Sequence, residues 1–264
     1  MNVIALSLAS FVAWFISTLA GGGSPMIMIP LVNMLLSPQA VAPVITGGML
    51  LGLSQRSWLF WDFIDWQVTR WYLPGAIAGG VLGAYAFTII QLEWLQVLIG
   101  FFLIFTVFNY VFSKKERTFP MQLWQFLPVG FLHAFTSGIV GSTGPAMNPF
   151  YLNYGLVKEE MVATKSLNMV VIHVVKMITY AALGVLTPEY LGYGFAIGLA
   201  AVPANWMGQY VLAKMNEQQF RKLVFAFMAV TGVFMIWQQR QVFNFGILDW
   251  VMGNFQGINA VKLG

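Results

Sequence analysis

Long apolar segments separated by short polar stretches fill most of the chain. They lie at residues 3–20, 24–36, 40–61, 71–90, 94–112, 123–141, 145–156, 160–184, 190–212 and 219–237. Most have the length of about 18–25 residues that an α-helix needs to cross the hydrocarbon core of a bilayer. The pattern predicts an all-α, polytopic membrane protein with about eight long hydrophobic helices.

Two of the segments, 24–36 and 145–156, are too short to cross a bilayer comfortably. Each follows a glycine-rich break and has proline at its second position, Pro25 and Pro145. Proline fits the first turn of a helix, where its missing N–H needs no partner. Ser24 is predicted to cap the first short helix, and Gly144 to take that place in the second. We expect each short helix to be either re-entrant or one half of a broken span.

The two halves of the chain match without a gap when the sequence is shifted by 120 residues, the spacing between Pro25 and Pro145. The shift aligns the breaks and several polar positions: Ser17 with Ser137, Gly21 with Gly141, Asn33 with Asn153, Met49 with Met169 and Arg56 with Lys176. We interpret this as an internal repeat. It divides the chain into a first membrane repeat (1–112), a cytoplasmic linker (113–122), a second membrane repeat (123–237) and an amphipathic C-terminal tail (238–264). Matched helix interruptions in two halves are typical of a transporter binding site.

The composition excludes a soluble protein. Only 8% of the residues are charged and 59% are hydrophobic, whereas soluble domains carry about 25% charged residues. The net charge of +4 indicates basic cytoplasmic loops, so we predict no nucleic-acid partner. The chain has no cysteine, which excludes disulfides, thiol catalysis and cysteine metal sites.

The distribution of basic residues favours an inverted arrangement of the halves. If each short helix returns the chain to the side it came from, eight basic residues share one face: Arg70, Lys114, Lys115, Arg117, Lys158, Lys214, Arg221 and Lys222. The positive-inside rule then makes this face cytoplasmic. Both termini are predicted to be non-cytoplasmic, in a multi-pass protein of the cytoplasmic membrane.

A helix that begins at mid-depth predicts an anion site. Lipid cannot hydrogen-bond the free N–H groups at the start of such a helix, so they must face protein or a cavity. The positive end of the helix then favours a negatively charged ligand. Inverted repeats would bring two such ends toward one point. The alternative is that the glycines only allow close helix packing.

The ionisable residues inside the spans are Arg56, His133, Lys165, His173 and Lys176, without a deep carboxylate. Buried charge is costly in a membrane, so we expect the balancing charge to arrive with an anionic substrate. The alternative for the cations is that they snorkel to the headgroups. For His173 we prefer a hydrogen bond to a neighbouring helix over proton transfer with the anion.

Hydroxyl and amide groups complete the predicted site. Thr46 and Ser166 either contact an oxyanion or bond back to a helix carbonyl. The predicted substrate-binding residues are Gly22, Gly23, Ser24, Pro25, Thr46, Arg56, Ser142, Thr143, Gly144, Pro145, Asn148, Lys165, Ser166, Asn168 and His173.

The stretches "STLAGGGSPMIMIPLV" and "SGIVGSTGPAMNPFYL" resemble the duplicated glycine-rich signatures of the TauE/SafE sulfite exporter family. Pro30 and Pro149 supply the later proline of the family pattern, and the resemblance covers residues 3–237. "VITGGM" at 44–49 and "GSTGP" depart from the usual pattern. The resemblance implies a membrane permease for small sulfur-containing anions, with export as the favoured direction.

We therefore predict a secondary transporter for sulfite or organosulfonates that works without a P-loop, a cofactor or a metal. An enzyme is not expected, because the two histidines lack a nearby deep carboxylate or cysteine. The alternatives are an anion channel and a transporter of a non-sulfur organic anion. The partners are the anion and the lipid bilayer. A coupling proton and a homodimer stay open.

Overall fold

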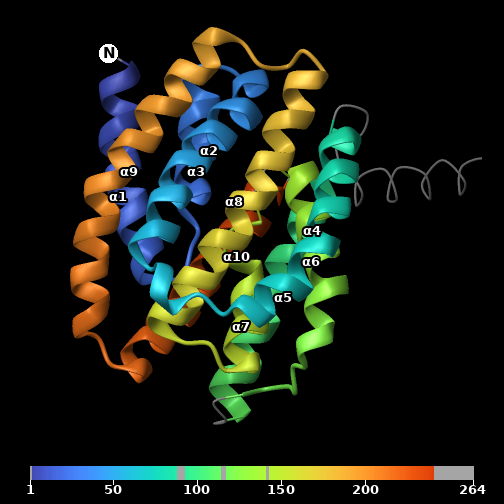
Figure 1. Ribbon diagram of the computed structural model, residues 1–264, viewed down its shortest axis with the longest axis vertical. Helices are drawn as coiled ribbons and strands as arrows, with labels where there is room; N and C mark the ends of the chain where they lie inside the picture. Colours follow the sequence, from blue (N-terminus) through green and yellow to red (C-terminus); the bar gives the residue numbers. More distant parts are fainter. Residues whose placement is uncertain (1, 88–92, 114–116, 141–142, 241–264) are drawn as a thin grey trace, which may run out of the picture.

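The computed structural model describes residues 2–87, 93–113, 117–140 and 143–240. These residues form a helical bundle without β-strands (Figure 1). The α-helices are α1 (Asn2–Leu19), α2 (Ser24–Leu35), α3 (Pro38–Leu59), α4 (Trp66–Phe87), α5 (Glu93–Ser113), α6 (Phe126–Val140), α7 (Asn148–Tyr154), α8 (Lys158–Ala182), α9 (Pro188–Lys214) and α10 (Glu217–Gln238). The all-α prediction is confirmed, and each predicted apolar segment coincides with one helix.

Length and composition distinguish the helices as candidate membrane spans. Among the described residues, four helices are long and apolar enough to cross a bilayer: α5, α6 with the turn before it, α8 and α10. Helices α3, α4 and α9 are as long, with 22, 22 and 27 residues, but their glycine and polar positions lower their mean hydropathy. The predicted count of eight spans therefore stays a prediction.

The two short helices differ in how they begin. Helix α2 follows Gly21, Gly22 and Gly23, whose φ angles of +67°, +121° and +113° only glycine adopts readily. Gly23 takes the cap position, and the hydroxyl of Ser24 instead donates to Met49 Sδ at 3.5 Å. The prediction that Ser24 caps α2 is therefore wrong by one residue.

The second interruption is less regular than the first. A 3₁₀ turn, Gly144–Met147, precedes α7, and Thr143 occupies the position before that turn. The predicted cap at Gly144 is therefore also wrong. The two prolines explain this arrangement. Pro145 and Pro149 each favour the start of a helical segment, so a 3₁₀ turn begins at Gly144 and α7 begins at Asn148.

Glycines let two pairs of helices approach closely. On α4, Gly75, Gly79 and Gly83 face the carbonyl groups of Leu127, Phe131 and Phe135 on α6, and a methyl group on any of the three would overlap them. On α9, Gly194 and Gly198 meet α3. Small residues at such contacts are how membrane helices bring their backbones together.

The packing of the helices can be compared with the predicted repeat, which stays a prediction. Helix α9 packs against α1 and α3, and α4 packs against α6 and α8. The shift of 120 residues relates α1 to α6, α3 to α8 and α9 to α4, so it relates the first set of contacts to the second. Figure 1 shows the two sets on opposite sides of the bundle, with α1 and α9 on the left and α4 and α6 on the right.

The connections gather at the two ends of the bundle. At one end, the N–H of Asp65, in the connection after α3, donates to Thr164 Oγ1 in the second turn of α8 at 2.8 Å. At the other end, Gln239 Nε2 after α10 donates to Gln96 Oε1 near the start of α5 at 3.0 Å. Figure 1 places the N-terminus and the α8–α9 connection at the end opposite the α9–α10 connection.

Some predicted features lie outside the described residues. They are Lys114 and Lys115 in the linker, Ser142 in the second break, and all but the first residues of the tail 238–264.

We predict that Gly79→Ala lowers the stability of the fold. The added methyl would overlap the Phe131 carbonyl, and overpacking of this kind costs about 1–3 kcal/mol. Gly192→Ala in α9 is the control, because a methyl there meets nothing within 4 Å. Thermal unfolding in detergent, followed by tryptophan fluorescence, compares the two. Equal unfolding midpoints would contradict the close α4–α6 contact.

Candidate functional site

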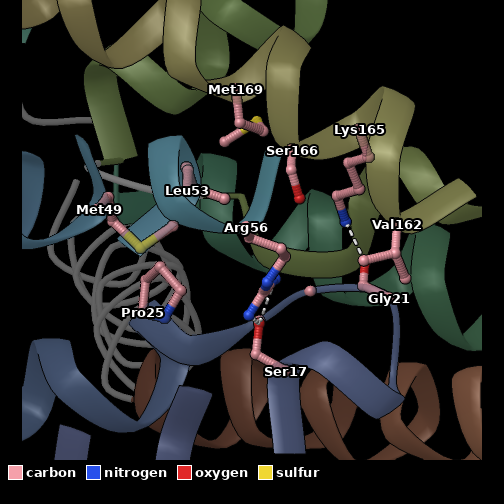
Figure 2. Close-up of a pocket in the computed structure, with 12 residues that line it drawn as sticks. Ser17, Gly21, Pro25, Met49, Leu53, Arg56, Val162, Lys165, Ser166 and Met169 are labelled. Carbon is pink, nitrogen blue, oxygen red and sulfur yellow. Dashed lines mark hydrogen bonds between the residues drawn. The ribbon is translucent and has the colours of Figure 1, made fainter. Parts of the chain in front are cut away.

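A small pocket lies where the first chain break meets α3 and α8. The centre of a water molecule can occupy about 20 Å³ of the pocket. This volume has room for about one water. Figure 2 shows Arg56, Lys165 and Ser166 directed into the same region from two helices. The pocket is lined by Ser17, Gly21, Gly22, Gly23, Pro25, Met49, Leu53, Arg56, Val162, Lys165, Ser166 and Met169.

The glycine loop forms one wall of the pocket. The N–H of Gly22 donates to the Ser17 carbonyl at 2.7 Å, which ends α1 in a tight turn. A Cβ on Gly22 would lie 2.5 Å from Lys165 Nζ. Glycine is therefore needed here both for its positive φ and for the space that Lys165 occupies. The first turn of α2 begins at this wall, and its positive end is on the pocket side.

Lys165 joins the two interrupted segments. Its ammonium group donates to the Gly21 carbonyl at 2.7 Å and to Asn148 Oδ1 at 2.6 Å. The amide nitrogen of Asn148 in turn donates to the Ala20 carbonyl at 3.3 Å. The break after α1 and the start of α7 are therefore neighbours in space, although they lie 128 residues apart. Lys165 is buried, so it does not snorkel to the headgroups.

Arg56, on α3, is held inside the bundle by residues of two other helices, α1 and α9. Its Nε donates to Asn205 Oδ1 at 3.0 Å, and its Nη groups donate to Ser17 Oγ at 3.4 Å and to the Trp14 carbonyl at 3.3 Å. The guanidinium group also lies 4.7 Å from the centre of the Trp14 ring. The alternative that Arg56 snorkels is therefore wrong: only 2% of the residue is exposed.

The pocket combines two cations with no lining carboxylate. Within the described residues the one ion pair joins Lys158 and Glu159 at 3.3 Å, at the start of α8. No group of three or more His, Asp or Glu residues there could hold a metal ion. The partners of Arg56 and Lys165 described above are carbonyl, amide and hydroxyl groups.

The structure brings together part of the predicted site. Six predicted residues line the pocket: Gly22, Gly23, Pro25, Arg56, Lys165 and Ser166. Asn148 contributes through its hydrogen bond to Lys165.

The other predicted residues do not line this pocket. Pro145 and Gly144 belong to the 3₁₀ turn before α7. The buried hydroxyl groups of Thr46 and Thr143 have no hydrogen-bond partner among the described residues, so Thr46 does not bond back to its helix as the alternative expected. Asn168 Nδ2 donates to the Tyr151 hydroxyl at 3.0 Å. His173 lies one turn beyond Met169 and also lacks a described partner, which contradicts its expected interhelical hydrogen bond.

Sequence reasoning missed Asn205, which holds Arg56 in place. Besides accepting from Arg56, Asn205 accepts from Thr18 Oγ1 at 3.0 Å and donates to the Gly52 carbonyl and to Gln55 Oε1 at 2.9 and 2.7 Å. An asparagine in the middle of an apolar helix is a signal that could have found it.

Comparison with known proteins gives one clear match. A family model described as "Sulfite exporter TauE/SafE" matches residues 6–235, nearly the whole chain. The chain belongs to the TauE/SafE family. Searches of curated proteins and of solved structures give no match.

Membership in the TauE/SafE family gives the broad class of this protein. It is a multi-pass membrane protein of a transporter family named for sulfite export. The pocket described above lies within the matched residues, at the break that the first glycine-rich signature forms.

We predict that Asn205→Leu destabilises this TauE/SafE protein by at least about 2 kcal/mol, because it leaves buried polar groups, including Arg56, without a partner. Gln209→Leu, one turn later, removes one hydrogen bond of 3.2 Å to the Leu59 carbonyl and should cost less than about 1 kcal/mol. Thermal unfolding of both variants in the same detergent tests the difference. If Gln209→Leu unfolds at the lower temperature, the assigned role of Asn205 is wrong.

Proposed function

We propose that this protein is a secondary transporter that exports small sulfur-containing anions, such as sulfite or organosulfonates, across the cytoplasmic membrane. The observation that carries the proposal is the pocket between the first chain break, α3 and α8. Two buried cations, Arg56 and Lys165, line it without a carboxylate. A bound anion would balance the positive charge of Arg56 and Lys165. Without such a balance, buried charge inside a membrane is costly.

The groups around the pocket are suited to replace the hydration shell of an oxyanion. Lys165 and Arg56 offer charged N–H donors, and Ser17 and Ser166 offer hydroxyl groups. The start of α2 adds the positive end of a helix at the glycine loop. On the remaining side, Met49 and Met169 present thioethers, which are polarisable and tolerate ligands of varied shape.

The pocket as it stands is too small for the proposed substrate. Its open space of about 20 Å³ holds about one water molecule, whereas sulfite has four heavy atoms. Binding therefore requires Lys165 or Arg56 to move away from its present partners. We assign this conformation to an occluded step of a transport cycle.

Alternating access would come from movement of two interlocked groups of helices. One group contains α1, α2, α3 and α9, and the other contains α4, α6 and α8; α9 packs against α1 and α3, and α4 packs against α6 and α8. The pocket lies where α3 of the first group meets α8 of the second. Rocking of inverted halves about a fixed central site is the usual scheme for transporters of this kind.

We propose that the end of the bundle with the α3–α4 and α9–α10 connections is cytoplasmic. Lys158 and Lys214 flank connections at this end. Trp58, Trp61, Trp66 and Trp71, around the α3–α4 connection, are 70%, 50%, 43% and 42% exposed, as expected of an interfacial belt. Both termini then lie on the non-cytoplasmic side.

The test of the proposed function is counterflow in proteoliposomes. Vesicles loaded with unlabelled sulfite should accumulate radiolabelled sulfite transiently, because a carrier exchanges substrate through one site. Organosulfonates should compete, and a carboxylate of similar size should not. Steady currents without counterflow would indicate an anion channel, and preference for the carboxylate would indicate a transporter of non-sulfur anions.

We predict that Lys165→Ala abolishes sulfite counterflow while the protein still inserts and folds. The loss of a buried charge-assisted contact removes at least about 1.5–3 kcal/mol of anion binding. Lys158→Ala, at the partly exposed start of the same helix, is the matched control and should transport at the wild-type rate. Wild-type transport by Lys165→Ala would show that the substrate site lies elsewhere.

A further inference from the structure

A second group of buried polar side chains lies farther along α8, beyond the pocket. It consists of Ser137 on α6 and of His173 and Lys176 on α8, each fully buried. The ammonium group of Lys176 donates to the Ser137 carbonyl at 3.2 Å. His173 lies one turn before Lys176 on the same face of α8. From Lys165 to Lys176 the helix rises by about 16 Å at ~1.5 Å per residue.

This group repeats a contact that the pocket itself contains. In the pocket, the Arg56 guanidinium donates to Ser17 Oγ at 3.4 Å. The shift of 120 residues carries Ser17 to Ser137 and Arg56 to Lys176. Each half of the chain therefore sets a serine from the helix before the break against a cation from the long helix after it. The same shift relates Met49 to Met169, which both line the pocket.

The second group differs from the first in having polar atoms without partners. Both ring nitrogens of His173 and the hydroxyl of Ser137 have no hydrogen bond to any described residue. Such buried groups each cost about 1–3 kcal/mol. Around Arg56, by contrast, Asn205 and Ser17 are engaged in hydrogen bonds. An oxyanion at the second group would give these unpartnered atoms a hydrogen-bond partner.

The surroundings supply no negative charge to this second group. The described parts of α4 and α6 contain no Asp or Glu, and the two carboxylates of α8, Glu159 and Glu160, are in its first turn. The titratable neighbours include Tyr180, one turn beyond Lys176 on α8, and His133 on α6, which shares a hydrogen bond of 2.6 Å with Tyr72 on α4. Every ionisable group here is therefore neutral or cationic at neutral pH.

The two groups lie on opposite sides of Lys165. Arg56 is three residues before the end of α3, at the end of the bundle where the α3–α4 connection meets the start of α8. Lys176 is near the opposite end of α8, toward the α8–α9 connection. An anion that passes from one end to the other would meet Arg56, Lys165 and Lys176 in turn.

We propose that Ser137, His173 and Lys176 form a second anion-binding station that serves the α8–α9 end of the bundle and is separate from the central pocket lined by Ser17, Arg56 and Lys165. The proposal rests on the proposed transport function. Lys176 supplies the charge, and the Ser137 hydroxyl and one His173 N–H supply donors to the oxyanion. The station is closed in this conformation and opens when access switches to that end.

The experiment measures sulfite transport from each side of oriented proteoliposomes. The chain has no cysteine, so Glu189→Cys and Lys222→Cys mark the two ends for a membrane-impermeant maleimide. Lys176→Gln should raise KM for sulfite presented at the Glu189 end by at least about tenfold, the effect of losing a charge-assisted hydrogen bond. KM at the Lys222 end should change by less than about twofold.

Three further variants keep the test decisive. Arg56→Gln, which changes the central pocket, should raise KM at both ends. Lys176→Arg, which installs the cation of the first repeat, should keep KM within about threefold of the wild type at both ends. Ser137→Ala removes a hydroxyl without a described partner, so it should fold normally and raise KM only at the Glu189 end. It replaces Lys176→Gln in the test if that variant fails to insert.

The outcomes separate this inference from the proposed function. If Lys176→Gln and Ser137→Ala change KM equally at both ends, or at neither, while Lys165→Ala abolishes transport, the second station is wrong and the central site stands. If Lys165→Ala transports at the wild-type rate, the proposed function of the pocket fails first.

Discussion

The architecture depends on how a chain can be interrupted inside a membrane without leaving polar groups unpaired. Lys165 provides the solution at the first break, because its ammonium group binds the Gly21 carbonyl and the Asn148 side chain together. Backbone groups freed by the break gain a charged partner, and the charge gains acceptors. Lipid could supply neither. One side chain on α8 therefore fixes the position of two segments from different halves of the chain.

The same arrangement explains why the site is built on cations and backbone dipoles. Under the proposed function, a carboxylate beside Lys165 or Arg56 would neutralise the charge permanently and leave nothing for an anionic substrate to balance. Carbonyl and amide oxygens instead satisfy the N–H donors while leaving the net charge in place. Such partners can be exchanged for an oxyanion at modest cost, since each lost hydrogen bond is replaced by another.

Much of the fold could be predicted from the sequence because its strongest signals are local. Apolar segments bounded by glycine and proline predict every described helix. Gly22 and Pro25 are predicted as site residues from the break between two such segments, and Arg56 and Lys165 because charged residues are rare inside them. The predicted caps at Ser24 and Gly144 are each one residue too late, because the backbone places Gly23 and Thr143 in the cap positions. Asn205 and the unpartnered state of His173 depend on which helices pack together, and no short stretch of sequence carries that information.

The close contacts of α4 with α6 and of α9 with α3 have a consequence for how the two halves depend on each other. Helix α4 of the first half packs against α6 and α8 of the second half, and α9 of the second half packs against α1 and α3 of the first. The groups of closely packed helices therefore differ from the two halves of the predicted repeat. If the first half were expressed alone, the glycines of α4 would face lipid, because the α6 carbonyl groups that they contact belong to the second half. If the predicted repeat arose by duplication, its two copies complete one another, and a change in one helix of such a pair must be accommodated by its partner in the other half.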